Sequence, residues 1–68
     1  MMIYIALIKS KDEGHPSKLI VRDVEREIKE YLLSLPVAYV VETFAVYNGE
    51  TKATKYYSLR DLVAFLKD

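Results

Sequence analysis

The sequence lacks the residues that small proteins use as covalent or metal cross-links. Its 68 residues include no cysteine and a single histidine. Disulfide bonds are therefore excluded, and so is a structural zinc site built from the usual cysteine and histidine ligands. A chain of this length buries only about 60% of its unfolded surface, so its stability is marginal without help. Oligomerisation is then the common remaining source of additional stability.

Long apolar runs and an excess of one charge are also missing. The longest apolar run, MMIYIALI, has eight residues, whereas a membrane span needs roughly 20. This run also lacks the charged segment and the cleavage site of a signal peptide. Ten basic and ten acidic residues leave a net charge of zero, while non-specific nucleic-acid binders are usually strongly basic. We therefore expect a cytoplasmic protein with no membrane partner, and nucleic acid is a less favoured ligand.

Residues that degrade at high temperature are scarce. Glutamine and cysteine are absent and Asn48 is the only asparagine, whereas lysine and glutamate are plentiful. This bias is a tendency of proteins from hot environments, and it predicts a thermophilic source.

Asn48 and Gly49 divide the clearest strand pattern of the chain, which runs over residues 37–57. Asn-Gly predicts a two-residue type I′ turn between strands, because both central residues of that turn need a positive φ. In the resulting register Glu42 faces Lys55. A one-residue bulge after Gly49 would shift this register and turn Lys55 outward, so the choice of core face stays open. The better core candidate is the face that carries Val40, Phe44, Val46 and Tyr57.

Three other segments have readable patterns. Residues 1–8 are apolar at both alternating sets of positions, which indicates a strand covered on both faces. Residues 18–35 have apolar side chains at spacings of three and four, which predicts an amphipathic helix that ends before Pro36. Ser58 and Asp61 resemble a capping box and predict a second helix of about ten residues. The first helical stripe comprises Ile20, Val24, Ile28, Tyr31 and Leu35, and its polar face includes Lys29.

This order of elements predicts one α+β domain over residues 1–68, with the order strand, helix, strand, strand, helix. A strand–helix–strand crossover makes the strands at 1–8 and 37–47 parallel. The strand at 50–57 can then lie between them, antiparallel to both, as in a split βαβ unit. The arrangement resembles a ferredoxin-like fold that lacks its fourth strand. In the alternative order the strand at 50–57 lies at the outer edge, and in both orders two helices cover one face of a three-stranded sheet.

The sheet face without helices is the candidate functional surface. We expect it to carry Tyr4, Ala6, Ile8, Tyr39, Val41, Ala45, Tyr47 and Tyr56. Exposed apolar patches larger than a few hundred Å² usually mark interaction sites. We therefore predict a protein-interaction or oligomerisation module that forms a homodimer, sheet on sheet or edge to edge, and that could also take a further protein partner. The candidate interface or ligand-binding residues are Tyr4, Ile8, Tyr39, Val41, Tyr47, Lys52 and Tyr56.

Single-stranded nucleic acid is the alternative ligand for the same face. In the split order, Tyr4 and Tyr56 would lie on adjacent strands with Tyr39 nearby, which resembles the stacking surface of ferredoxin-like RNA-binding domains. The resemblance is topological, because residues 51–57 read TKATKYY and not the Gly- and Phe-rich octamer of those domains. The neutral net charge also ranks this function second.

Catalytic and metal-binding residue sets are not evident in the sequence. There is no thiol, and the single His15 has no obvious nucleophile partner. The loop residues Asp12, Glu13 and His15 are typical of a solvated loop, because a metal site needs ligands that are fixed in geometry. The element order is also similar to that of the 4-oxalocrotonate tautomerases, but their chemistry needs an N-terminal proline and here Met2 follows the first residue. We expect no enzymatic activity, no metal and no cofactor.

Overall fold

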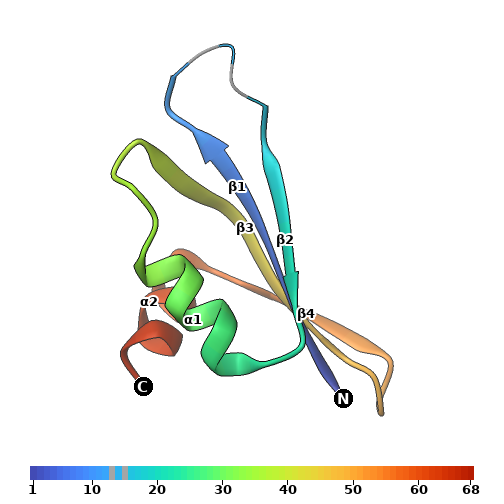
Figure 1. Ribbon diagram of the computed structural model, residues 1–68. Coiled ribbons are helices and arrows are strands. Elements are labelled where there is room, and N and C mark those ends of the chain that lie inside the picture. The colour runs from blue at the N-terminus through green and yellow to red at the C-terminus, as the bar shows by residue number, and fades with distance from the viewer. Residues whose placement is uncertain (13, 15) are drawn as a thin grey trace.

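Four antiparallel strands and two helices make up the protein in a computed structural model that describes residues 1–68 except 13 and 15 (Figure 1). The elements in chain order are β1 (Met2–Ser10), β2 (Lys18–Arg22), α1 (Glu25–Leu33), β3 (Tyr39–Asn48), β4 (Ala53–Tyr57) and α2 (Leu59–Lys67). The strand order in the sheet is β2-β1-β3-β4, and all neighbours are antiparallel. The predicted three-stranded sheet in β-α-β-β-α order is therefore wrong, while the small α+β class is confirmed.

The additional strand, β2, occupies the first five residues of the segment predicted to be a long helix. Its sequence KLIVR also alternates with a period of two, so Leu19 and Val21 lie on one face and Ile20 on the other. The β-branched side chains of Ile20 and Val21 favour an extended backbone. Pairing with β1, where Val21 lies opposite Ile5, decides between the two periodicities. The helix α1 is consequently limited to Glu25–Leu33.

The insertion of β2 also changes the direction of the central pairing. β2 turns the chain back alongside β1 before α1 carries it across to β3. β1 and β3 are therefore antiparallel neighbours, with Tyr4 opposite Val46, and the predicted parallel orientation of these two strands is wrong. β1 is an interior strand between β2 and β3, but the helices cover only the face that carries Tyr4, Ala6 and Ile8.

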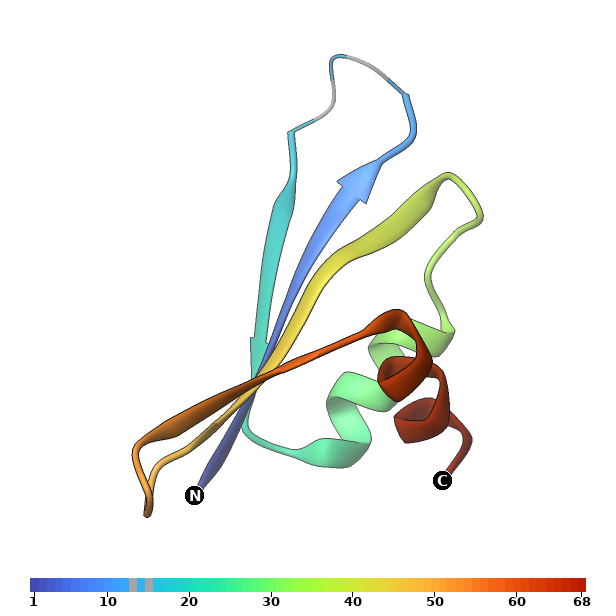
Figure 2. The same ribbon diagram turned by 180° about the vertical axis from the view of Figure 1, so that it is seen from behind.

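Both helices lie on the same face of the sheet, as predicted (Figures 1 and 2). The buried core beneath them consists of Tyr4, Ala6, Ile8, Ile28, Leu32, Phe44, Val46 and Leu62. Phe44 lies at the centre of an aromatic cluster, with its ring centroid 5.1 Å from that of Tyr57 and 5.3 Å from that of Phe65. These contacts join the sheet to α2, which at nine residues is too short to persist alone.

The two ends of α2 are held by different contacts. At its start the Ser58 Oγ accepts a hydrogen bond from the Asp61 N–H at 3.1 Å, which confirms the predicted cap. Near its end the Lys29 Nζ lies 4.7 Å from the centroid of the Phe65 ring and donates to the main-chain oxygen of Asp68 at 3.1 Å. Lys29 therefore connects α1 to α2, although its position in the sequence places it on the polar face of the first helix.

The hairpin predicted at Asn48-Gly49 is formed by β3 and β4, but its turn is longer than expected. Residues 49–52 connect the strands, with Asn48 paired to Ala53. The residue with positive φ among them is Lys52, at 58°. The predicted two-residue type I′ turn is therefore wrong.

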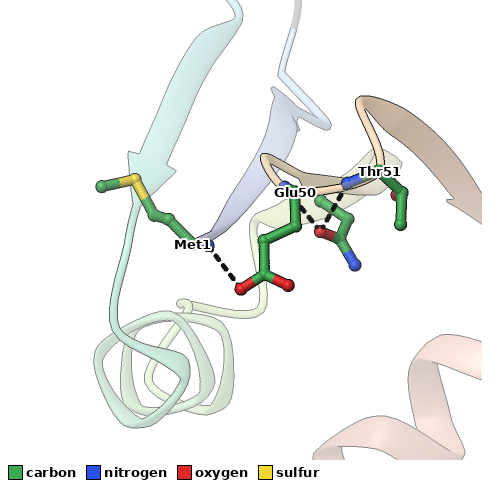
Figure 3. A network of polar contacts seen from close by, with 4 residues as sticks. Met1, Glu50 and Thr51 are labelled. Carbon is green, nitrogen blue, oxygen red and sulfur yellow. Dashed lines mark hydrogen bonds and ion pairs between the residues drawn. The ribbon is translucent and has the colours of Figure 1, made fainter.

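Asn48 and Gly49 stabilise this turn through contacts and not through positive φ angles. The Asn48 Oδ1 accepts hydrogen bonds from the backbone N–H of Glu50 at 2.9 Å and of Thr51 at 3.3 Å (Figure 3). This is the local side-chain bonding that makes asparagine frequent in turns. The Gly49 N–H donates to the carbonyl oxygen of Met1 at 2.7 Å, and a Cβ on Gly49 would lie 3.0 Å from that oxygen. Glycine is therefore favoured by the close approach of the N-terminal strand.

The longer turn shifts the hairpin register without exchanging its faces. Tyr57 lies opposite Phe44, and Lys55 lies opposite Val46. The predicted cross-strand pair of Glu42 with Lys55 is therefore wrong. Because the register moves by an even number of residues, Phe44, Val46 and Tyr57 remain on the helix side, as predicted.

Candidate functional site

The face of the sheet turned away from the helices, here called the open face, follows from the strand registers. One row of side chains crosses all four strands, with Val21, Ile5, Ala45 and Tyr56 opposite one another in turn. The complete open face comprises Ile3, Ile5, Leu7, Lys9, Leu19, Val21, Val40, Thr43, Ala45, Tyr47, Thr54 and Tyr56. Lys9 is the charged side chain among these paired residues, and it lies at an end of the patch.

The open face is apolar and partly exposed. At its two edges Leu19 and Tyr56 are 64% and 72% exposed. In the middle, Ile5 and Leu7 are half-buried by their neighbours, and the small Ala45 is buried although the helices lie on the other side. An antiparallel sheet that faces water on one side normally alternates apolar with polar residues. Here the side that faces water is also mainly apolar, so the open face is the best candidate for an interaction surface.

The structure brings only some of the predicted interface residues to the open face. Tyr47 and Tyr56 lie there, as expected. The placement of the other apolar candidates on that face is wrong: Tyr4 and Ile8 are buried in the core, and Tyr39 and Val41 pack against it. The remaining candidate, Lys52, is exposed in the β3–β4 turn. Alternation does not identify the core-facing set in β1, because both sets are apolar. Leu19 and Val21 are absent from the predicted site because the pattern of residues 18–35 also fits a helix.

A β-bulge at Glu42 explains the exchange of faces in β3. The register against β1 shifts between Leu7 and Ile8, and Glu42 is the extra residue. One extra residue in a strand moves the side chains beyond it to the opposite face. Val41 therefore packs on the helix side, whereas Val40, which was predicted to be in the core, is 40% exposed on the open face. The predicted bulge lay after Gly49, in the turn, and not at this position.

The three tyrosines of the predicted stacking surface do not share a face. The Tyr4 ring is buried on the helix side, 6.0 Å from the centroid of Phe65. Tyr39 packs against the core on the same side, with the Lys18 Nζ 5.6 Å from its ring centroid. Tyr56 alone of the three is on the open face. The nucleic-acid alternative depended on a stacking surface made of these three tyrosines, and the fold does not form that surface.

The fold also affects the ionisation of Tyr4. Burial raises the pKa of the Tyr4 phenol above its ordinary value of 10.0, and the negative charge of Glu25 raises it further. The folded state therefore holds this proton more tightly than the unfolded chain does. Its contribution to stability is complete below the unfolded pKa and is lost as the pH rises through the folded pKa.

Tyr4→Phe is expected to flatten the loss of stability above the ordinary tyrosine pKa. Phenylalanine keeps the ring contacts but has no proton to lose, so the free energy of unfolding should fall less between about pH 9 and pH 11 than in the wild type. Urea unfolding at the two pH values measures this difference. Tyr56→Phe, the same change at a tyrosine that is 72% exposed in the monomer, is the control, and at a protein concentration too low for dimerisation it should keep the wild-type dependence. If the free energy of unfolding fell equally with pH in Tyr4→Phe and in the wild type, the raised pKa of Tyr4 would be refuted.

Groups of three acidic, histidine or cysteine side chains that could hold a metal do not occur among the described residues. Glu13 and His15, which the sequence places beside Asp12, lie outside those residues. Within the same part of the chain, no helix is both long enough and apolar enough to cross a membrane. Comparisons with protein-family models, with curated proteins and with solved structures found no match.

Proposed function

We propose that this protein is a small, non-catalytic cytoplasmic interaction module that forms a homodimer through its open face. The observation that carries the proposal is the apolar row of Val21, Ile5, Ala45 and Tyr56, which spans the whole sheet on the side that the helices leave uncovered. A second copy offers the same apolar surface, and a two-fold axis closes the assembly.

The energetics of the small domain support this pairing. Burying a large apolar side chain fully contributes about 1.5–3 kcal/mol relative to leaving it in water. The total stability of a native protein is only about 0.05–0.15 kcal/mol per residue. Covering Leu19 and Tyr56, which are largely exposed, and completing the burial of Ile5 and Leu7 would therefore add stability comparable to that of the monomer itself.

The distribution of charge favours packing face to face over pairing edge to edge. The charged residues within the two edge strands are all basic: Lys18 and Arg22 in β2, and Lys55 in β4. Joining any two of these edges would bring like charges together across the new ladder, which is a common protection of edge strands. Among the paired residues of the open face only Lys9 is charged, and it lies at an end of the patch. Two such faces can therefore meet without placing like charges against each other in the middle of the interface.

Sedimentation equilibrium tests the proposal, and the wild type is expected to be dimeric at about 100 µM. Val21→Lys and Tyr56→Lys should each weaken association by at least about tenfold, because the dimer would bury an unpaired ammonium group. Both positions are exposed, Val21 at 47%, so the monomers should stay folded, and far-ultraviolet circular dichroism checks this.

Val37→Lys is the matched control for the charge substitutions. It makes the same change at a residue that is 87% exposed and lies between α1 and β3, outside the sheet. It should leave the dimer intact. A wild type that is monomeric at about 100 µM, or a dimer that survives both open-face substitutions, would contradict the proposal.

A further inference from the structure

A cavity of about 290 Å³ lies on the helix side of the sheet, opposite the open face. It is lined by Ile8, Lys18, Tyr31, Leu35, Pro36 and Tyr39. These residues come from β1, β2, α1, the segment after α1 and β3, so the cavity exists only in the folded chain. Ile8 belongs to the buried core, which gives the cavity a packed floor.

The walls of the cavity combine aromatic rings with one cation. Tyr31 and Tyr39 supply the rings, and the Lys18 Nζ lies 5.6 Å from the centroid of the Tyr39 ring. The ion pairs formed by the described residues do not include Lys18. Its ammonium group lies beside an aromatic face, where it can pair with an anion.

The remaining wall is held in place by the backbone. Pro36 has a fixed φ, and its carbonyl oxygen accepts a hydrogen bond from the Tyr39 N–H at 3.0 Å. The neighbouring Leu35 packs against the core. This side of the cavity is consequently formed before any ligand arrives, which lowers the entropy lost on binding.

We propose that this cavity binds a small aromatic carboxylate. The ring of the ligand packs against Tyr31 and Tyr39, where aromatic pairs are favoured over simple apolar contact. The carboxylate pairs with the Lys18 ammonium in a charge-assisted hydrogen bond. A volume of about 290 Å³ is at the lower end of ligand cavities, which suits a ligand with a single ring. The inference is independent of the proposed homodimer, which uses the opposite face.

Phenylacetate is a suitable probe, titrated into ¹⁵N-labelled protein and followed by NMR. Saturable shifts are expected at Ile8, Tyr31 and Tyr39, with a dissociation constant of about 1 mM for so small a ligand. Lys18→Gln should weaken phenylacetate binding about tenfold through loss of the charged partner. The same substitution should leave the binding of 2-phenylethanol, the neutral analogue, unchanged.

Lys55→Gln is the matched control, because Lys55 is another exposed lysine whose Nζ lies over a tyrosine ring, 5.0 Å from the centroid of Tyr57. It should leave phenylacetate binding unchanged. Absence of saturable shifts at the lining residues up to about 20 mM phenylacetate would overturn the proposal. Cyclohexylacetate, which has similar size and charge without an aromatic ring, should bind more weakly, and equal binding would overturn the aromatic assignment.

Discussion

Phe44→Ala is expected to leave the chain largely unfolded at 25 °C. Phe44 is 1% exposed and contacts both Tyr57 and Phe65 with its ring. Truncation of a buried phenylalanine to alanine lowers the free energy of unfolding by about 3–5 kcal/mol. That loss is comparable to the whole stability expected for a chain of 68 residues. Circular dichroism and urea unfolding measure the result.

Leu59→Ala is the control for Phe44→Ala. Leu59 is also a large apolar residue, but it is 76% exposed at the start of α2. Its truncation should change the free energy of unfolding by less than about 0.5 kcal/mol, because surface substitutions away from special contacts have small effects. A cooperative transition of Phe44→Ala close to that of Leu59→Ala would show that the aromatic cluster is not the centre of the core.

Adjacent valines in β3 are expected to respond in opposite ways to the same substitution. Val41→Lys would place an ammonium group on the helix side, against the core, and should lower the free energy of unfolding by about 2–3 kcal/mol through lost burial and charge desolvation. Val40→Lys would place it on the open face, where Val40 is already 40% exposed, and should change the stability of the monomer little. The contrast follows from the bulge at Glu42.

Urea unfolding of both variants measures this contrast, at a protein concentration low enough to keep them monomeric. Equal destabilisation of Val40→Lys and Val41→Lys would show that the two residues do not lie on opposite faces. Greater destabilisation by Val40→Lys would restore the uninterrupted alternation that the sequence suggested. The experiment therefore tests the bulge directly and does not depend on self-association.

The parts of the fold that could be predicted are those set by local patterns. The β3–β4 hairpin, the Ser58 cap and the helix around Ile28 and Leu32 each depend on neighbouring residues, and each is present. Phe44 was assigned to the correct face because alternation around it is unbroken up to the turn. Confinement of both helices to one face followed from their apolar stripes.

The parts that were missed depend on partners far away in the sequence. KLIVR fits a strand and a helix equally well, and pairing with β1 makes it a strand. Asn-Gly has a strong preference for a two-residue turn, but the turn also contacts Met1 through Gly49, and a longer loop forms. The bulge at Glu42 arises in the pairing with β1, and no feature of the local sequence marks it.

The candidate site was predicted at the level of a surface and not at the level of its residues. A helix-free apolar face was expected and exists, and Tyr47 and Tyr56 lie on it. Its other members changed because β1 is apolar on both sides, so periodicity alone cannot say which set meets the helices. The cavity beside Lys18 was not predicted, since it requires β2 to be a strand.

The interior position of β1 has a consequence for cooperativity. β1–β2 and β3–β4 are local hairpins, and the pairing of β1 with β3, residue 4 with residue 46, joins them. An isolated two-stranded hairpin is at best marginally stable in water, so neither half can persist without this non-local contact. Closing the intervening loop carries an entropy loss that must precede the gain from pairing. We therefore expect the chain to fold in a single cooperative transition, with neither hairpin stable alone.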